Sequence, residues 1–359
     1  MDMLWYVFQG CFDRLKIIKY NFYYYITAVA QFVENETRKL LQQEYQLGGP
    51  IMKSMYVQKD MFVDGQKIHY YEIGSKGKPL IMIHAQGVDA LSYENVWKPL
   101  SRNYHIYAVD CPGHGVSTHD STVYSLESIG QMMIKFIRGL GVSSVTLTGH
   151  SSGGLIAAYV AANSNLCEKL ILEDPPFFAC EGDRRKTTYN YLDLSSVCHN
   201  YLAEGGSRDF ILYYFTNQKA WEFFPEKSRD RVKNALVARA RKYRVKHPDR
   251  TLKVPFWPKA ALLAYRGMQN YDPRFGDAFY MDTFNEGVNH AQMLSQVTCE
   301  TIYLKAKTVV GSDGTLQAAN SEEDAERVQA LIQNCRTVRL DCGHAVHNER
   351  KKAFLACFS

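Results

Sequence analysis

Short apolar runs alternate with helical patterns along most of this chain, and this alternation restricts the possible folds more than any other feature. The runs have the length and composition of strands buried on both faces. They lie at residues 79–84, 104–110, 145–149, 169–173, 301–306 and 337–340. Strands that alternate with helices predict a mostly parallel sheet covered by helices on both faces.

Helical patterns fill the spaces between these runs. Leu126, Ile129 and Met133 share one face of the segment 124–140, and Gly141 is expected to end that helix. Further helices are predicted at 155–162, 321–333 and 348–358. Before the first run, residues 55–74 read as two strands joined by the turn Asp64-Gly65, which is typical of a β-hairpin.

The patterns divide the chain into three parts. Residues 51–174 and 297–359 contain the alternating pattern and are predicted to form an α/β core. Residues 175–296 contain no buried-strand run but carry apolar and aromatic residues at helical spacing. We therefore expect them to form an inserted helical lid. Residues 1–50 read as a helical extension that precedes the core.

The extension is the one part with a membrane-like stretch. Residues 17–33 are rich in aromatics, but Lys19 and Asn21 interrupt them, and 17 residues is short for a span. This favours a helix packed on the domain or a poorly ordered extension. The alternatives are a peripheral membrane contact through residues 1–50 and, less favoured, a true membrane span.

Charge and cysteine content narrow the class of protein. A net charge of +5 in 359 residues does not indicate nucleic-acid binding. Lys and Arg do gather between residues 227 and 253, which favours a solvated helix face over a site for an acidic ligand or membrane surface.

The nine cysteines form no C-x-x-C pair, and no signal peptide is evident. Free thiols and a cytoplasmic location are therefore expected.

The strongest chemical signal is Gly149-His150-Ser151-Ser152-Gly153, which lies between a predicted buried strand and a helix. It fits G-x-S-x-G, in which a serine sits on a strained turn at the end of a strand. Glycines two residues before and after remove side chains that would collide in that turn. Ser151 is therefore the predicted nucleophile.

A general base follows the last predicted strand. His344, in Gly343-His344, can reach the same edge of the sheet and take the serine proton. His347 lies three residues further on and is expected to support it. An acyl-transfer site also needs two backbone N–H groups for the oxyanion. We assign these to Ser152 and Gln86.

With these residues the chain resembles the α/β-hydrolase superfamily from about residue 55 to residue 359. The resemblance rests on four motifs, which are His84-Ala85-Gln86-Gly87, Asp110-x-x-Gly113-His114-Gly115-x-Ser117, the Gly149 to Gly153 turn and Gly343-His344. Ala85 stands where the family usually has glycine. The resemblance implies an eight-stranded sheet, a lid after the sixth strand and a triad in the order Ser, acid, His.

The acid has two alternative positions. In most of the family it follows the seventh strand, and here the first acid after that strand is Asp313. Some branches place it after the sixth strand, where Asp174 lies. We favour Asp174, with Asp313 as the alternative and Glu173 as a less favoured one. The acid would hold the tautomer of His344.

These assignments predict a serine esterase or lactonase that works through an acyl-enzyme on a substrate with an apolar acyl or alcohol part. Amide or thioester cleavage stays open. Alternatives are a cofactor-free lyase or acyltransferase on the same fold, and a slow-turnover ligand-binding receptor. No H-E-x-x-H, P-loop or dinucleotide motif occurs, so no metal or cofactor is expected. The sequence does not indicate an oligomeric state.

Overall fold

The computed structural model describes residues 56–206, 209–254 and 259–359. The predicted extension, residues 1–50, and the membrane contact considered for it lie outside the described residues. The eight strands are β1 (Tyr56–Val63), β2 (Gln66–Ile73), β3 (Lys78–Ile83), β4 (Tyr104–Val109), β5 (Val145–His150), β6 (Cys167–Glu173), β7 (Glu300–Lys305) and β8 (Cys335–Arg339).

All eight strands form one sheet in the order β1-β2-β4-β3-β5-β6-β7-β8. The β1–β2 and β2–β4 pairs are antiparallel, and every later pair is parallel. Asp64 and Gly65 both have positive φ, 51° and 80°, as the predicted hairpin turn requires. This confirms the predicted eight-stranded, mostly parallel sheet.

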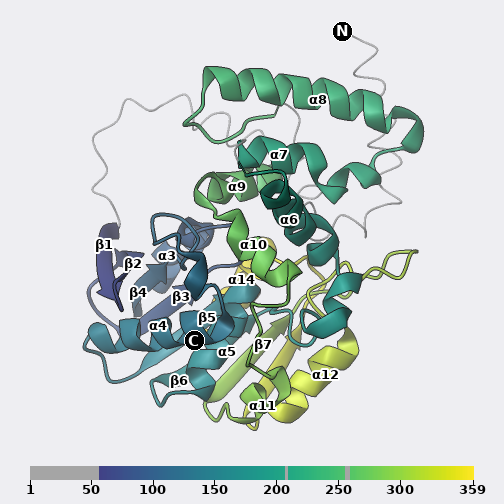
Figure 1. Cartoon of the computed structure of the whole chain (residues 1–359). Helices are drawn as coiled ribbons and strands as arrows, with labels where there is room; N and C mark the ends of the chain where they lie inside the picture. The colour runs from purple at the N-terminus through teal and green to yellow at the C-terminus, as the bar shows by residue number, and fades with distance from the viewer. Residues whose placement is uncertain (1–55, 207–208, 255–258) are drawn as a thin grey trace.

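Helices cover both faces of the sheet and extend beyond one of its edges (Figure 1). They are α3 (Glu94–Leu100), α4 (Leu126–Gly139), α5 (Ser152–Ala162), α6 (Ser196–Ala203), α7 (Phe210–Asn217), α8 (Glu226–Lys246), α9 (Lys259–Gly267), α10 (Pro273–Tyr280), α11 (His290–Ser295), α12 (Glu322–Leu331), α13 (Val346–Glu349) and α14 (Lys351–Ala356). None of these described helices has the length and apolar character needed to cross a bilayer.

The core has two layers because side chains along a strand alternate between the two faces of the sheet. Leu80 and Met82 of β3 pack with Trp97 of α3 and with α14. Ile81 and Ile83 face the opposite way, into the larger cluster that contains α4, α5, α11 and α12. The side chains of one short apolar strand therefore pack alternately into the two layers of the core.

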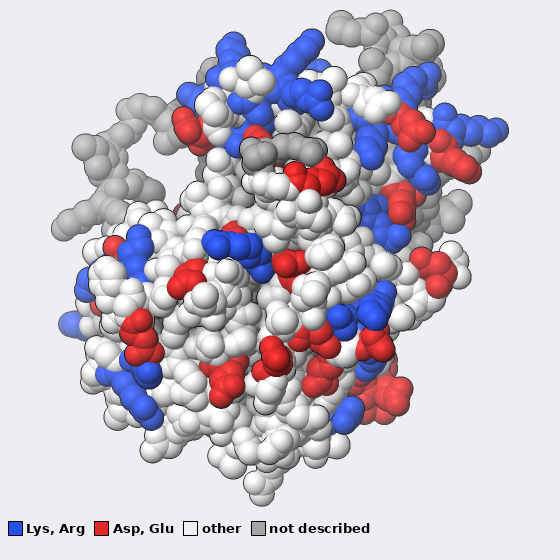
Figure 2. Space-filling model, viewed as in Figure 1, with Lys and Arg blue, Asp and Glu red and all other residues white. Residues whose placement is uncertain are grey.

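The segment between β6 and β7 contains α6 to α11, and α6 to α10 lie above the sheet in Figure 1, with α8 farthest from it. This helical insertion is anchored by buried aromatic residues such as Tyr214, Phe215 and Tyr265. The basic stretch of the sequence forms α8 and the residues after it. Figure 2 shows Lys and Arg side chains gathered on this outermost part of the molecule.

Candidate active site

Ser151 occupies the turn between β5 and α5. β5 ends at His150, α5 begins at Ser152, and Ser151 between them has φ 54° and ψ −120°. A non-glycine residue in this region is strained, and such strain persists only where the surrounding structure holds it. Here the backbone N–H of Ser151 donates to the carbonyl oxygen of Glu173, at 2.9 Å, which ties the turn to the end of β6.

The glycines on either side of Ser151 are required by close backbone contacts. A Cβ added at Gly149 would lie 2.1 Å from the carbonyl oxygen of Gly153. One added at Gly153 would lie 2.4 Å from the carbonyl oxygens of both Ile83 and His84. The motif therefore allows α5 to begin directly against the end of β3, where the predicted oxyanion loop starts.

His344 lies in the loop after β8 and is paired with Asp174. Its Nδ1 is 2.8 Å from Oδ2 of Asp174, and the carboxylate is only 1% exposed. The ring of His344 is 4.5 Å from the ring of His150, which directly precedes Ser151. The structure thus brings His344, Asp174 and the β5–α5 turn together at the carboxyl ends of the strands.

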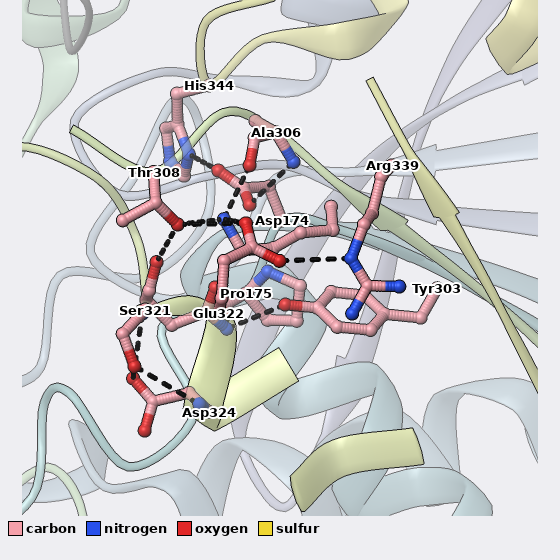
Figure 3. Close-up of polar contacts among 12 residues, drawn as sticks. Asp174, Pro175, Tyr303, Ala306, Thr308, Ser321, Glu322, Asp324, Arg339 and His344 are labelled. Atoms are coloured by element: carbon pink, nitrogen blue, oxygen red, sulfur yellow. Dashed lines mark hydrogen bonds and ion pairs between the residues drawn. The ribbon is translucent and has the colours of Figure 1, made fainter. Parts of the chain in front are cut away.

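The second oxygen of Asp174 is held by the end of β7. Oδ1 accepts a hydrogen bond of 3.1 Å from the backbone N–H of Ala306, and Figure 3 shows the carboxylate between His344 and Ala306. Lys305 is buried beside it and donates to the carbonyl oxygen of Ala306, at 2.5 Å, and to Thr308 Oγ1, at 2.9 Å. Thr308 and Arg339 both donate to Glu322, which lies 3.8 Å from the Lys305 ammonium.

The alternative acid, Asp313, lies elsewhere. It is exposed in the loop after β7, and its two oxygens accept from the backbone N–H and the hydroxyl of Thr315, at 3.0 and 2.8 Å. These hydrogen bonds lower the pKa of the Asp313 carboxyl. Of the three acids weighed from the sequence, Asp174 is the one whose carboxylate pairs with His344.

The two predicted oxyanion donors lie at the start of α5 and in the neighbouring loop after β3. Ser152 is the first residue of α5, and N–H groups in the first turn of a helix have no acceptor within it. In the loop after β3, the N–H groups of Gly87 and Val88 are already used, by His114 Nε2 at 3.2 Å and by the Ala85 carbonyl at 3.4 Å. The assignment of Gln86 as the second oxyanion donor stays a prediction.

Two side chains from the sequence motifs, His84 and Asp110, hold this loop in place. His84 accepts a hydrogen bond from the backbone N–H of Cys111. Asp110 accepts one from Ala90 and one from Val116. A Cβ at Gly115 would lie 2.0 Å from the Asp110 carboxylate, which explains the glycine after His114.

The helical insertion covers the loop. The side chain of Gln86 donates to the hydroxyl of Tyr271, at 3.0 Å, and accepts from Asn190, at 3.3 Å. A Cβ at Gly87 would lie 3.3 Å from Leu194 and 3.5 Å from Met268. Apolar and aromatic side chains of the insertion therefore lie directly above the proposed oxyanion site.

Three buried groups, His150, Glu173 and His347, lie next to the site. The sequence offered Glu173 only as a less favoured acid and His347 only as a support of His344, and it gave His150 no role. Glu173 accepts from the backbone N–H of His347, at 2.8 Å, and pairs with its Nδ1, at 2.7 Å. Nε2 of His150 lies 2.9 Å from the carbonyl oxygen of His344. The sequence signal that could have found them is that two consecutive acids, Glu173-Asp174, stand at the end of one predicted strand. Two histidines three residues apart, His344 and His347, follow another predicted strand.

These three side chains are also of the types that bind metal ions. The ligand atoms of His150, Glu173 and His347 lie within 4.8 Å of one another. However, Glu173 Oε1 and His347 Nδ1 already bond to each other, and Tyr93 donates to Glu173 Oε2 at 3.2 Å. A metal ion would have to displace these hydrogen bonds, so the cluster fits a hydrogen-bond network better than a metal site.

Comparison with known proteins agrees with this architecture. Residues 78–244 match a family model described as the alpha/beta hydrolase fold. The sequence is 37% identical over 93 residues to the (E)-2-((N-methylformamido)methylene)succinate hydrolase of Acinetobacter baylyi, covering 26% of this chain and 35% of that protein. It is 28% identical over 118 residues to a pimeloyl-[acyl-carrier protein] methyl ester esterase of Vibrio cholerae, covering 32% of this chain and 44% of that protein.

The matched region thus spans less than half the length of these two relatives. Likeness among solved structures extends further. The enol-lactonase of Burkholderia xenovorans superposes with a TM-score of 0.58 at 15% identity, over 84% of this chain and 99% of that one. At this identity the likeness establishes the fold alone.

Proposed function

Because this chain belongs to the α/β-hydrolase superfamily, we propose that it is a serine hydrolase that cleaves a carboxylic ester or a lactone. The observation that carries the proposal is the strained Ser151 turn beside the His344–Asp174 pair, whose Nδ1 and Oδ2 atoms are 2.8 Å apart. Asp174 accepts a hydrogen bond from the protonated Nδ1 of His344, so Nε2 keeps a lone pair that can take the serine proton.

In the proposed mechanism, the oxygen of Ser151 attacks the substrate carbonyl as His344 removes its proton. The backbone N–H groups of Ser152 and Gln86 stabilise the oxyanion that forms. His344 then returns the proton to the leaving alcohol, and an acyl-enzyme remains on Ser151. Water, activated by the same imidazole, releases the acid.

The surroundings of the site favour an apolar substrate group. Leu194, Met268 and Tyr271 of the insertion lie against the loop that carries Gln86. Such side chains gain most from burying an acyl chain or an apolar alcohol. An ester-cleaving role also agrees with the name of one sequence relative, a methyl ester esterase.

The test is turnover of p-nitrophenyl esters of increasing acyl length, with Ser151→Ala as the control. We expect release of p-nitrophenol by the wild type and only background hydrolysis by the variant. Equal turnover by both proteins would refute the proposal. Labelling of Ser151 by a fluorophosphonate without turnover would favour the receptor. Transfer to an added alcohol in preference to water would favour an acyltransferase.

A further inference from the structure

The end of β6 and the loop after β8 are joined by two acid–histidine pairs rather than one. Asp174 pairs with His344, and the residue before it, Glu173, pairs with His347. Glu173 is fully buried as the last residue of β6, whereas Asp174 has a positive φ of 45°. The two consecutive carboxylates thus reach two histidines of the same loop.

Glu173 is held in its ionised form although it has no exposed surface. Burial alone would raise its pKa, but His347, whose ring and backbone N–H both bond Oε1, lowers the pKa of Glu173 to about 2. Its other oxygen accepts from the hydroxyl of Tyr93, whose pKa is raised by burial. Glu173 is therefore a buried carboxylate with a donor on each oxygen.

The hydrogen bonds around His347 assign its tautomer. Asn95 of α3 donates to Oδ1 of Asn348, at 2.9 Å, which turns the amide nitrogen of Asn348 toward Nε2 of His347, at 3.0 Å. That nitrogen must accept, so the proton of His347 sits on Nδ1 and is donated to Glu173. Asn95 also donates to the carbonyl oxygen of His347, at 3.2 Å.

His150 supports the loop from the other side. Burial lowers the pKa of His150 to about 3, so its ring is neutral at physiological pH. A neutral ring carries one proton, and the contact of Nε2 with the carbonyl oxygen of His344 places it there. Nδ1 of His150 has no partner among the described residues. The backbone of His344 is thus fixed by the residue before Ser151.

We propose that Glu173 and His347 are positioning residues, which lock the loop between residues 343 and 347 to the end of β6 and so hold the imidazole of His344 in its working position. Neither residue touches the substrate in this account. The inference rests on the proposed hydrolase function, because it concerns the same general base. Its physical basis is that misplacement of a catalytic group by about 1 Å can cost on the order of 100-fold in rate.

The test compares Glu173→Gln, His347→Gln and the double variant in p-nitrophenyl ester turnover. Gln keeps the shape of Glu173 but removes its charge. We expect kcat to fall by about 10- to 100-fold in each single variant, with KM within about twofold of wild type. Because the two side chains act as one unit, the double variant should be no slower than the slower single variant.

A matched control is Asp324→Asn, which alters another buried carboxylate, in the cap of α12, that bonds Arg184. This variant should lose thermal stability but keep kcat. Unchanged kcat in both folded single variants would overturn the proposal, as would equal losses of kcat in the control. If Glu173→Gln does not fold, His347→Gln provides the same test.

A second measurement separates this inference from the proposed function. In protein labelled with ¹⁵N-histidine, the ring signals of His344 should move in Glu173→Gln and His347→Gln but not in Asp324→Asn. These signals do not depend on turnover, so a wild type that cleaves no ester would refute the hydrolase alone. Unmoved His344 signals in both variants would refute the positioning role alone.

Discussion

The sharpest consequence of the site geometry is the effect of Asp174→Asn. The Asp174 carboxylate receives two donors, Nδ1 of His344 on Oδ2 and the backbone N–H of Ala306 on Oδ1. An asparagine offers only one oxygen. Since the N–H of Ala306 cannot change its role, the oxygen should face Ala306, and the amide NH₂ should face His344.

This orientation forces the wrong tautomer. Facing an NH₂ donor, Nδ1 of His344 must accept, so its proton moves to Nε2, which can then no longer take the proton of Ser151. The expected loss in kcat is about 10³- to 10⁴-fold, equivalent to about 4–5.5 kcal/mol of transition-state stabilisation. The opposite amide orientation would leave the N–H of Ala306 facing a donor, at a cost of about 1–3 kcal/mol.

The assay is steady-state hydrolysis of a p-nitrophenyl ester by Asp174→Asn, with Asp313→Asn as the matched control. Asp313 is exposed and, among the described residues, its carboxylate is hydrogen-bonded only to Thr315, so the control should keep near-normal kcat. Near-normal turnover of Asp174→Asn, or a large loss in Asp313→Asn, would refute the assignment of the acid.

Two further predictions concern the fold around the site. In Gly153→Ala, the added Cβ would lie 2.4 Å from the carbonyl oxygens of Ile83 and His84, so we expect a loss of about 1–3 kcal/mol in the free energy of unfolding together with reduced kcat. Urea unfolding and ester turnover at wild-type levels would contradict this. Asp193, buried in the insertion, has its pKa raised by burial from 3.8 to about 6. The folded protein binds the proton of this carboxyl more tightly than the unfolded chain does. The stability that the protonated carboxyl contributes is therefore lost as the pH rises from about 4 to above 6. Relative to wild type, Asp193→Asn should gain about 2–3 kcal/mol in the free energy of unfolding between pH 4 and pH 7. A pH-independent difference in urea unfolding would show that this reasoning is wrong.

The sheet could be predicted because each of its signals is local. Apolar runs fixed the position of β3 to β7 within a few residues, and the Asp64-Gly65 pair has the positive φ angles of the turn. The glycines around Ser151 were likewise readable, because the close approaches that require them recur in any strand–turn–helix of this kind. The ends of the helices were predicted less closely than the positions of the strands. The predicted helix 348–358 is divided at Arg350 into α13 and α14.

The partners of the histidines could not be read in the same way. Whether His344 meets Asp174 or Asp313 depends on where the loop after β8 returns over the sheet, which is a long-range property. The same holds for Glu173, which the sequence offered only as a less favoured acid and which the structure pairs with His347. Residues far apart in the chain also close the oxyanion loop, since Tyr271 and Asn190 reach Gln86 from the insertion.

The central claim is that Ser151 carries the acyl group, and rapid-quench mass spectrometry tests it most directly. When a p-nitrophenyl ester is mixed with the enzyme, we predict a burst of about one p-nitrophenol per enzyme, with the acyl mass found on the peptide that contains Ser151. Ser151→Ala should show neither. Steady turnover without a burst and without an acylated peptide, or an acyl group on another residue, would contradict the account.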